Sequence, residues 1–143
     1  MNRQEFSKLL VDTRKEANCG MNEIGRRTGM MFSQIQRIET CYNNYSVVNV
    51  VKYLNALGRK LQLKCGRKAI VVADYKDIPE FFQQVRESKG VSQYRLAQII
   101  GRSITNVINM ENQITALHID SFLAIILGLK IDMKIILDVT PKK

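Results

Sequence analysis

The stretch Val91–Glu111 constrains the fold more than any other part of the chain. Gly101 divides it into two short segments, and Ser103 is a good N-cap for the second one. Apolar residues recur three or four positions apart on either side of this break, with Leu96, Ala97 and Ile100 before it and Val107, Ile108 and Met110 after it. This spacing predicts two short amphipathic helices joined by a tight turn. The rest of the chain must then bury their apolar faces.

The composition is that of a folded protein with no membrane or secretion signal. The chain has 143 residues, enough for one domain or two very small ones, and 45% of them are hydrophobic while 24% are charged. It has no run of 18 apolar residues, and its N-terminus lacks the apolar segment of a signal peptide. We therefore expect a cytoplasmic protein without membrane contact.

The residues that usually carry chemistry are few and scattered. Cys19, Cys41 and Cys65 lie far apart without a C-x-x-C pair, and His118 is the single histidine. We expect three free thiols, no bound metal and no cofactor. The sequence shows no nucleophile–base pair and no phosphate-binding loop, so we do not expect an enzyme.

The net charge of +9 favours a polyanionic partner. The charge is uneven along the chain. Residues 1–72 hold 13 Lys and Arg against 5 Asp and Glu, whereas residues 73–143 hold 9 against 8. A basic surface that only meets solvent is the alternative interpretation of this excess.

An internal repeat relates the two halves. A shift of 72 residues aligns 6–64 with 78–136 without a gap. Apolar positions and helix breaks coincide, and four positions are identical: Arg14/Arg86, Gly29/Gly101, Glu39/Glu111 and Leu57/Leu129. We interpret the chain as two diverged copies of one unit, at 1–73 and 74–143.

The same periodicities predict a mainly α fold with four helices and short strands in each half. The alternating segments LQLKC, AIVVA and KIDMKIILDV, at 61–65, 69–73 and 130–139, predict the strands, with a turn at Gly66-Arg67 between the first two. Helices are expected at 2–17, 21–28, 32–41, 47–57, 78–89, 93–100, 104–112 and 119–127.

The segments GVSQYRLAQIIGRSITNVINMENQ and LHIDSFLAIILGLKIDM resemble the lambda-repressor-like, or XRE/Cro, helix-turn-helix family. The resemblance covers about 60 residues of each half and implies that the second helix of the motif enters the DNA major groove. It also implies a salt bridge between Arg86 and Glu111, and the same separation links Arg14 to Glu39. Such a pair fixes the angle between two helices, so we do not count it as a functional site.

In the second half, the resemblance assigns DNA contacts residue by residue. Gln93 matches a glutamine that touches DNA phosphate, and Arg102 is placed to reach phosphate. Asparagine reads adenine, and Ile and Thr methyl groups contact the thymine methyl. The residues expected to face the groove are Ile104, Thr105, Asn106 and Asn109. A solvated polar face is the alternative.

The first half departs from the family pattern. Met21 and Gly20 replace the glutamine and its capping serine, and Met30-Met31-Phe32 stands at a position that is usually polar. An exposed Met-Met-Phe segment could dock a protein instead of DNA. The positions that still match DNA contacts are Ser33, Gln34 and Arg37, with adjacent charge from Arg26 and Arg27.

The apolar fourth helices, 47–57 and 119–127, predict how the halves meet. Residues 119–127 are apolar nearly all round, so this helix must pack on a neighbouring unit. The strands that follow resemble the HipB/HigA-like antitoxins, in which such strands pair across a dimer. We therefore expect an intramolecular pseudo-dimer, with helix four packed on helix four and a small antiparallel sheet. A homodimer that binds through one copy remains the alternative.

Together these features predict a transcriptional regulator of bacterial or phage type that binds double-stranded DNA sequence-specifically. The second hypothesis is an antitoxin-like or regulatory module, in which one half binds a protein partner such as a toxin or another regulator.

Overall fold

The computed structural model describes residues 1–138, which form eight helices and a three-stranded antiparallel sheet. Val139 of the expected C-terminal strand and residues 140–143 lie outside the described residues. None of the helices in the described range is long and apolar enough to cross a membrane. The elements are α1 Arg3–Glu16, α2 Met21–Thr28, α3 Phe32–Thr40, α4 Val47–Ala56, β1 Arg59–Cys65, β2 Lys68–Val72, α5 Asp77–Ser88, α6 Gln93–Ile100, α7 Ile104–Glu111, α8 Ile119–Gly128 and β3 Asp132–Leu137.

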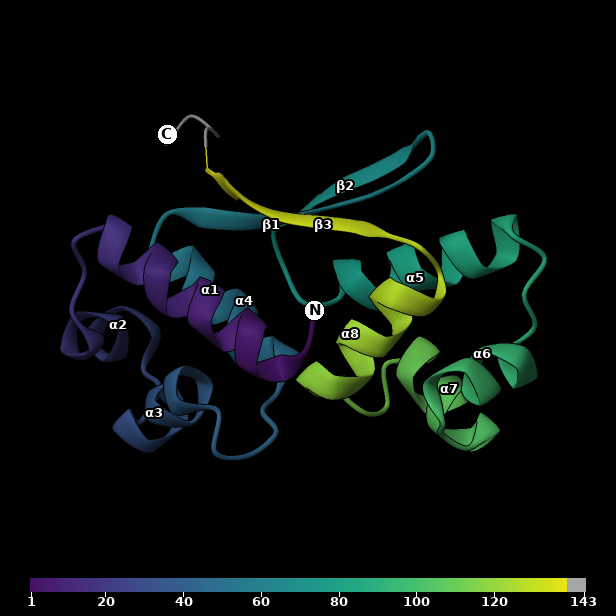
Figure 1. Ribbon diagram of the computed structural model, residues 1–143, viewed down its shortest axis with the longest axis horizontal. Coiled ribbons are helices and arrows are strands. Elements are labelled where there is room, and N and C mark those ends of the chain that lie inside the picture. Colours follow the sequence, from purple (N-terminus) through teal and green to yellow (C-terminus); the bar gives the residue numbers. More distant parts are fainter. Residues whose placement is uncertain (139–143) are drawn as a thin grey trace.

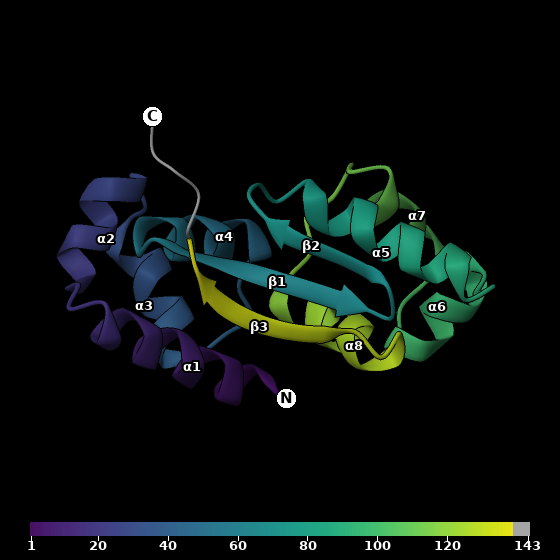
Figure 2. The same ribbon diagram turned by 90° about the horizontal axis from the view of Figure 1, so that it is seen from above.

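The helices lie in two groups beneath one sheet. In Figure 1, α1–α4 form the group on the left, α5–α8 form the group on the right, and the sheet runs across both. Seen from above in Figure 2, β1 lies between β2 and β3 and spans the junction of the two groups. The helices α3 and α7 lie on the side of the molecule away from the sheet (Figure 1). The prediction of a mainly α fold with a small antiparallel sheet is confirmed.

Local chemistry explains where the short helices begin and end. The side chains of Ser46, Ser92 and Ser103 each accept a hydrogen bond from a backbone N–H in the first turn of the following helix. Serine is a preferred N-cap residue, and the cap at Ser103 is the one that the sequence analysis predicts. Gly29 and Gly101 follow α2 and α6 with φ of 74° and 68°, a left-handed conformation that glycine adopts without a steric penalty.

The two helical groups match at the spacing of the sequence repeat. The bounds of α6 are those of α2 moved by 72 residues, and the bounds of α8 are those of α4 moved by the same amount. At the point where α2 and α3 approach each other, a Cβ on Gly25 would lie 3.5 Å from the carbonyl oxygen of Met30. The matching residue, Ala97, is buried. The repeat thus places a small residue at this point in both groups.

Reciprocal hydrogen bonds join the two groups below the sheet. The N–H of Val47 donates to the carbonyl of Leu117 at 2.9 Å, and the N–H of Ile119 donates to the carbonyl of Tyr45 at 2.8 Å. The two donors, Val47 and Ile119, are 72 residues apart, and so are the two acceptors, Tyr45 and Leu117. The repeat therefore relates one bond to the other. The residues between these bonds, Ser46 and His118, form an antiparallel bridge and are themselves 72 apart. The two groups are therefore related by an approximate twofold axis at this bridge.

The sheet repeats the same relation. β1 and β3 pair antiparallel, and the register places Gln62 opposite Lys134, again 72 residues apart. The approximate axis thus passes through the middle of the β1–β3 pair as well as through the bridge below it. The predicted sheet with strands from both halves is confirmed.

β2 departs from this symmetry. It forms a hairpin with β1 through the predicted turn at Gly66-Arg67, and it pairs with the edge of β1 opposite β3. There Ile70 and Val71 line a hollow together with Phe81 of α5, so the first half covers part of the second. Within residues 1–138, no strand occupies the corresponding edge of β3.

We expected the fourth helices of the two halves, α4 and α8, to pack on each other, but the structure shows a different contact. α4 and α8 are joined at their N-terminal ends by the bridge at Ser46 and His118. α8 instead packs against α6 of its own group and against α1 of the other group. Phe122 lies with its ring centroid 6.4 Å from that of Phe6 in α1 and 5.7 Å from that of Phe82 in α5. One continuous hydrophobic core therefore links the two groups.

Phe122→Ala tests this continuity. Because the ring is fully buried and contacts both groups, its loss should lower the free energy of unfolding by about 3–5 kcal/mol. Unfolding followed by circular dichroism in urea should remain a single transition. Leu127→Ala, at a position 76% exposed on the same helix, should change stability by less than about 0.5 kcal/mol. Two separate transitions in the wild-type chain would contradict a shared core.

Candidate nucleic-acid interface

An arginine–glutamate pair holds each of the helices α3 and α7 in place. Arg14 donates through Nε and Nη2 to both carboxylate oxygens of Glu39, at 2.7 and 2.8 Å. Arg86 donates to both carboxylate oxygens of Glu111 in the same way, at 2.7 and 2.9 Å. In both cases Nη1 also donates to the carbonyl five positions further along the chain. Each fork thus ties three segments of its group together, and the predicted salt bridges are confirmed.

The two carboxylates differ in their remaining partner. Glu39 accepts a hydrogen bond from the Tyr53 hydroxyl at 2.9 Å, whereas Glu111 accepts one from Nε2 of Gln93, also at 2.9 Å. Burial, followed by the negative charge of Glu39, raises the pKa of Tyr53. The hydrogen bond to Glu39 raises the pKa of Arg14 against the opposing effect of burial. Gln93, predicted to touch phosphate, therefore uses its amide nitrogen inside the protein.

The predicted residues of α7 lie on its outer side. Ile104, Thr105 and Asn106 are exposed and Asn109 is partly buried, while Val107 and Met110 between them face the core. Arg102, in the turn before α7, is also exposed, and it lines a hollow together with Asn106 and His118. The structure thus brings the second-half residues together at one helix and its preceding turn, except for Gln93, which lies in α6.

In α3, the matching side chains keep a hydroxyl and an amide group at two positions, and Arg37 replaces Asn109 at the third. Ser33 and Arg37 are exposed, and the Arg37 guanidinium lies over the ring of Tyr42, 5.8 Å from the centroid. Gln34 is partly buried, and its Oε1 accepts a hydrogen bond from the N–H of Met31 at 2.9 Å. Gln34 therefore caps the start of α3, where α7 has the hydroxyl of Ser103.

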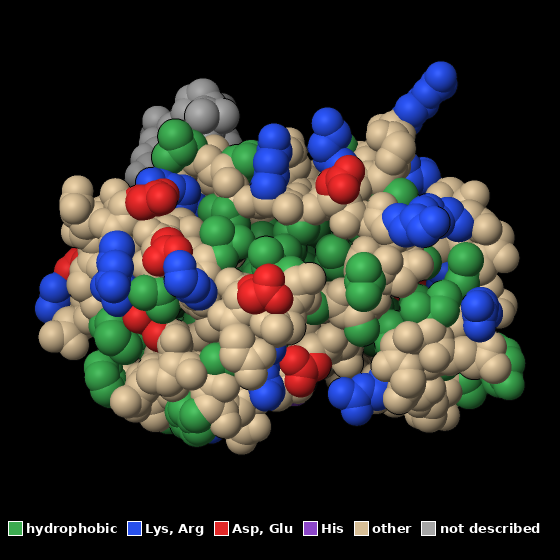
Figure 3. All heavy atoms as spheres, in the orientation of Figure 1, with side chains coloured by type: hydrophobic (Ala, Val, Ile, Leu, Met, Phe, Trp, Pro, Cys, Tyr) green, Lys and Arg blue, Asp and Glu red, His purple; other side chains and the backbone are tan. Residues whose placement is uncertain are grey.

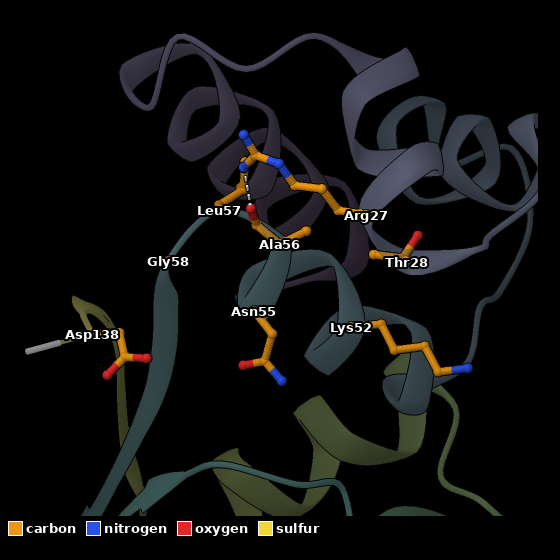
Figure 4. A pocket seen from close by; sticks show the side chains of 8 residues that line it. All are labelled: Arg27, Thr28, Lys52, Asn55, Ala56, Leu57, Gly58 and Asp138. Carbon is orange, nitrogen blue, oxygen red and sulfur yellow. Dashed lines mark hydrogen bonds between the residues drawn. The ribbon is translucent and has the colours of Figure 1, made fainter. Parts of the chain in front are cut away.

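Arg26 and Arg27 lie apart from this set. Both form ion pairs with Glu23 on their own helix, and their hydrogen bonds, that of Arg26 first, lower the pKa of Glu23. Nη1 of Arg27 also donates to the carbonyl of Ala56 at the end of α4, at 2.6 Å. Figure 4 shows Arg27 turned toward Ala56 at the rim of a hollow that reaches Asp138 at the end of the sheet. Arg27 thus faces the sheet side of its group.

The hollow in Figure 4 has a volume of about 700 Å³ and is lined by polar groups that bond within the protein. Asn55 donates to the carbonyl of Ala73 at 3.3 Å and accepts from Nζ of Lys60 at 2.6 Å. The residues that line the hollow are Arg27, Thr28, Lys52, Asn55, Ala56, Leu57, Gly58 and Asp138. This set offers no nucleophile beside a general base.

Metal ligands do not gather anywhere in residues 1–138. No three His, Cys, Asp or Glu side chains in this range lie close enough to hold an ion. Cys19, Cys41 and Cys65 are free thiols in the structure.

The excess positive charge of the first half collects in the β1–β2 hairpin. Five of its 13 basic residues lie there: Arg59, Lys60, Lys64, Arg67 and Lys68. Lysine and arginine side chains stand along the upper edge of the molecule in Figure 3, over the sheet and away from α3 and α7. The charge difference between the halves is therefore largely a property of the hairpin and not of α3.

Two exposed side chains close to α3 and α7 were not predicted from the sequence. Tyr42 and Ile114, 62% and 70% exposed, lie in the loops that follow α3 and α7. They are 72 residues apart, so the repeat alignment pairs them as apolar residues, each near polar residues of its loop. The pairing of these two residues in the repeat alignment could have identified them from the sequence.

Comparison of the chain with models of protein families, with curated proteins and with solved structures finds no match.

Glu111→Ala tests the fork that holds α7. It leaves Arg86 charged at a position where the side chain is 10% exposed, so we expect a loss of about 3–5 kcal/mol in the free energy of unfolding, measured in urea. The double variant Arg86→Met/Glu111→Leu removes both charges and should recover most of this loss. A cost below about 1 kcal/mol for the single variant would show that water reaches the pair.

Proposed function

We propose that the chain consists of two tandem helix-turn-helix units of the lambda-repressor-like, XRE/Cro kind, joined as a pseudo-dimer, and that it binds double-stranded DNA sequence-specifically as a transcriptional regulator. The units are α1–α4 and α5–α8, and α3 and α7 are their recognition helices. The observation that carries the proposal is the approximate twofold relation, with α3 and α7 both on the side away from the sheet (Figure 1).

This arrangement suits duplex DNA. Dimeric helix-turn-helix proteins place two recognition helices in successive major grooves on one side of the duplex, one helical turn or about 34 Å apart. A twofold relation between the two helices mirrors the twofold symmetry of the DNA backbone. Here a covalent chain supplies both helices, so one molecule would cover both half-sites.

The residues on the outer sides of α3 and α7 would read base edges. Asn109 and Asn106 carry amides suited to adenine, Thr105 carries a methyl and a hydroxyl group, and Arg37 suits guanine or phosphate. Arg102 and the backbone near Gln93 would meet phosphates. The cations of the hairpin would raise the long-range positive potential without touching the bound duplex.

Binding-site selection from random duplex DNA tests the proposal. We expect a recovered site with two different half-sites about 10 base pairs apart, because α3 and α7 differ at every outward position. Asn109→Ala should relax the base preference at one position by about 1–3 kcal/mol. A perfect palindrome would contradict the pseudo-dimer and favour a homodimer that binds through one unit. Recovery of no preferred sequence would contradict specific binding.

The salt dependence of binding should separate Arg37 from Arg26. Arg37 has an aromatic neighbour but no carboxylate partner in the described chain, whereas Arg26 is paired with Glu23. Arg37→Ala should therefore reduce the slope of log K against log salt by about one unit. Arg26→Ala serves as the matched control and should change the slope by much less. Equal slopes for the wild-type chain and Arg37→Ala would remove Arg37 from the interface.

A protein-interaction module is the second candidate, and one observation favours it. Met31 and Phe32, at the start of α3, are 64% and 55% exposed. Exposed methionine and aromatic side chains are common at protein-binding surfaces. In this alternative the first unit would hold a toxin or another regulator while the second holds DNA. Replacing both residues with serine would then leave DNA affinity unchanged.

A further inference from the structure

The two recognition helices begin with exposed hydrophobic side chains at matching positions. Phe32 is the first residue of α3 and 55% exposed, and Ile104 is the first residue of α7 and 41% exposed. The two are 72 residues apart. Single exposed hydrophobic residues are ordinary on a protein surface. Here, however, an apolar and exposed side chain stands at the same position in both units, although the two residues differ, which points to a shared role.

The place of these residues in the helix limits what they can touch. A helical side chain leans toward the N-terminus, so a side chain at the first position extends past the start of the helix. Its neighbours on the outer side are Ser33 in α3 and Thr105 in α7, both exposed. Under the proposed DNA binding, on which this inference rests, the N-terminal residues of a recognition helix contact base edges.

The major groove offers one apolar group to such a side chain. Base edges there present hydrogen-bond donors and acceptors, except for the 5-methyl group of thymine. Against any other edge, a phenyl or butyl group would remove polar atoms from water without replacing their hydrogen bonds, which is unfavourable. We propose that Phe32 and Ile104 each pack on a thymine 5-methyl group, one in each half of the DNA site, and so specify thymine at two related positions.

A thymine contact explains both positions, whereas a docked protein explains only one. Phe32 has Met31 beside it, and these two side chains form a small apolar surface. Ile104 stands alone between Ser103 and Thr105, which are polar and exposed. A protein that fitted the first surface would find no equivalent at α7, but a methyl group needs contact with one apolar side chain only.

Replacing thymine with uracil in the selected duplex tests the proposal directly. The substitution removes the 5-methyl group and keeps the hydrogen-bonding edge of the base. Burial of one methyl group corresponds to about a fourfold change in Kd. We expect this loss at one thymine in each half-site, and a much smaller change at thymines elsewhere in the duplex.

Variants then assign each methyl group to its side chain. Ile104→Ala should weaken binding to the thymine duplex and abolish the uracil effect in one half-site, and Phe32→Ala should do the same in the other. Ile114→Ala removes an equally large side chain that is 70% exposed in the loop after α7, so it is the matched control and should retain both uracil effects. Thermal unfolding should be similar for all three variants, because none of these side chains is buried.

The outcomes separate this inference from the function on which it rests. Specific DNA binding that is insensitive to uracil at every position would overturn the thymine contacts and leave the proposed function intact. Uracil effects that persist in Phe32→Ala would show that Phe32 does not contact thymine and would overturn the inference at α3. Failure of the wild-type chain to bind any duplex would remove the proposed function itself.

Discussion

The reciprocal pairing between the two halves is the interaction on which the rest of the structure depends. Two sets of contacts lie on the same approximate axis: the bridge at Ser46 and His118 below, and the pairing of Gln62 with Lys134 in the sheet above. Each hydrogen bond contributes only about 0.5–1.5 kcal/mol to stability. Their separation along the axis matters more, because it prevents one group from tilting against the other, while the six-residue ladder between β1 and β3 restrains rotation about the axis. The orientation of α3 relative to α7 follows from this.

Within each half, an arginine–glutamate fork fixes the position of the outer helix, α3 or α7, relative to the first helix of its group. A buried ion pair adds little net stability, because desolvation of both charges offsets their attraction. Its value here is geometric, since the planar guanidinium accepts only a narrow range of carboxylate positions. Arg14 and Arg86 bind the same three segments in their two groups. The second partner of the carboxylate differs, Tyr53 in one group and Gln93 in the other, so the fork tolerates change around it.

Local signals in the sequence predicted most of the fold, and partners distant in sequence account for what was missed. The breaks at Gly29 and Gly101, the serine caps and the hairpin turn each depend on a few neighbouring residues, so periodicity and turn chemistry revealed them. The bond from Arg27 to Ala56 spans 29 residues, and it is set by how α2 and α4 pack. The capping role of Gln34 was missed because outward residues at helix starts serve equally well as caps or as contacts. The two forks were predicted only because a family pattern supplied them.

The distribution of identical residues shows what a covalent pair permits that a homodimer does not. Three of the four identities across the repeat are Arg14/Arg86, Gly29/Gly101 and Glu39/Glu111, which set the helix angles. Outward positions on α3 and α7 share no identity. In a homodimer every substitution appears twice, so both recognition surfaces must change together. In one chain the halves keep a common frame while each surface changes separately, and the placement of β2 on one side alone shows the same freedom. Under the proposed DNA binding, a target with two unlike halves is therefore the kind of site that this architecture matches and a symmetric dimer does not.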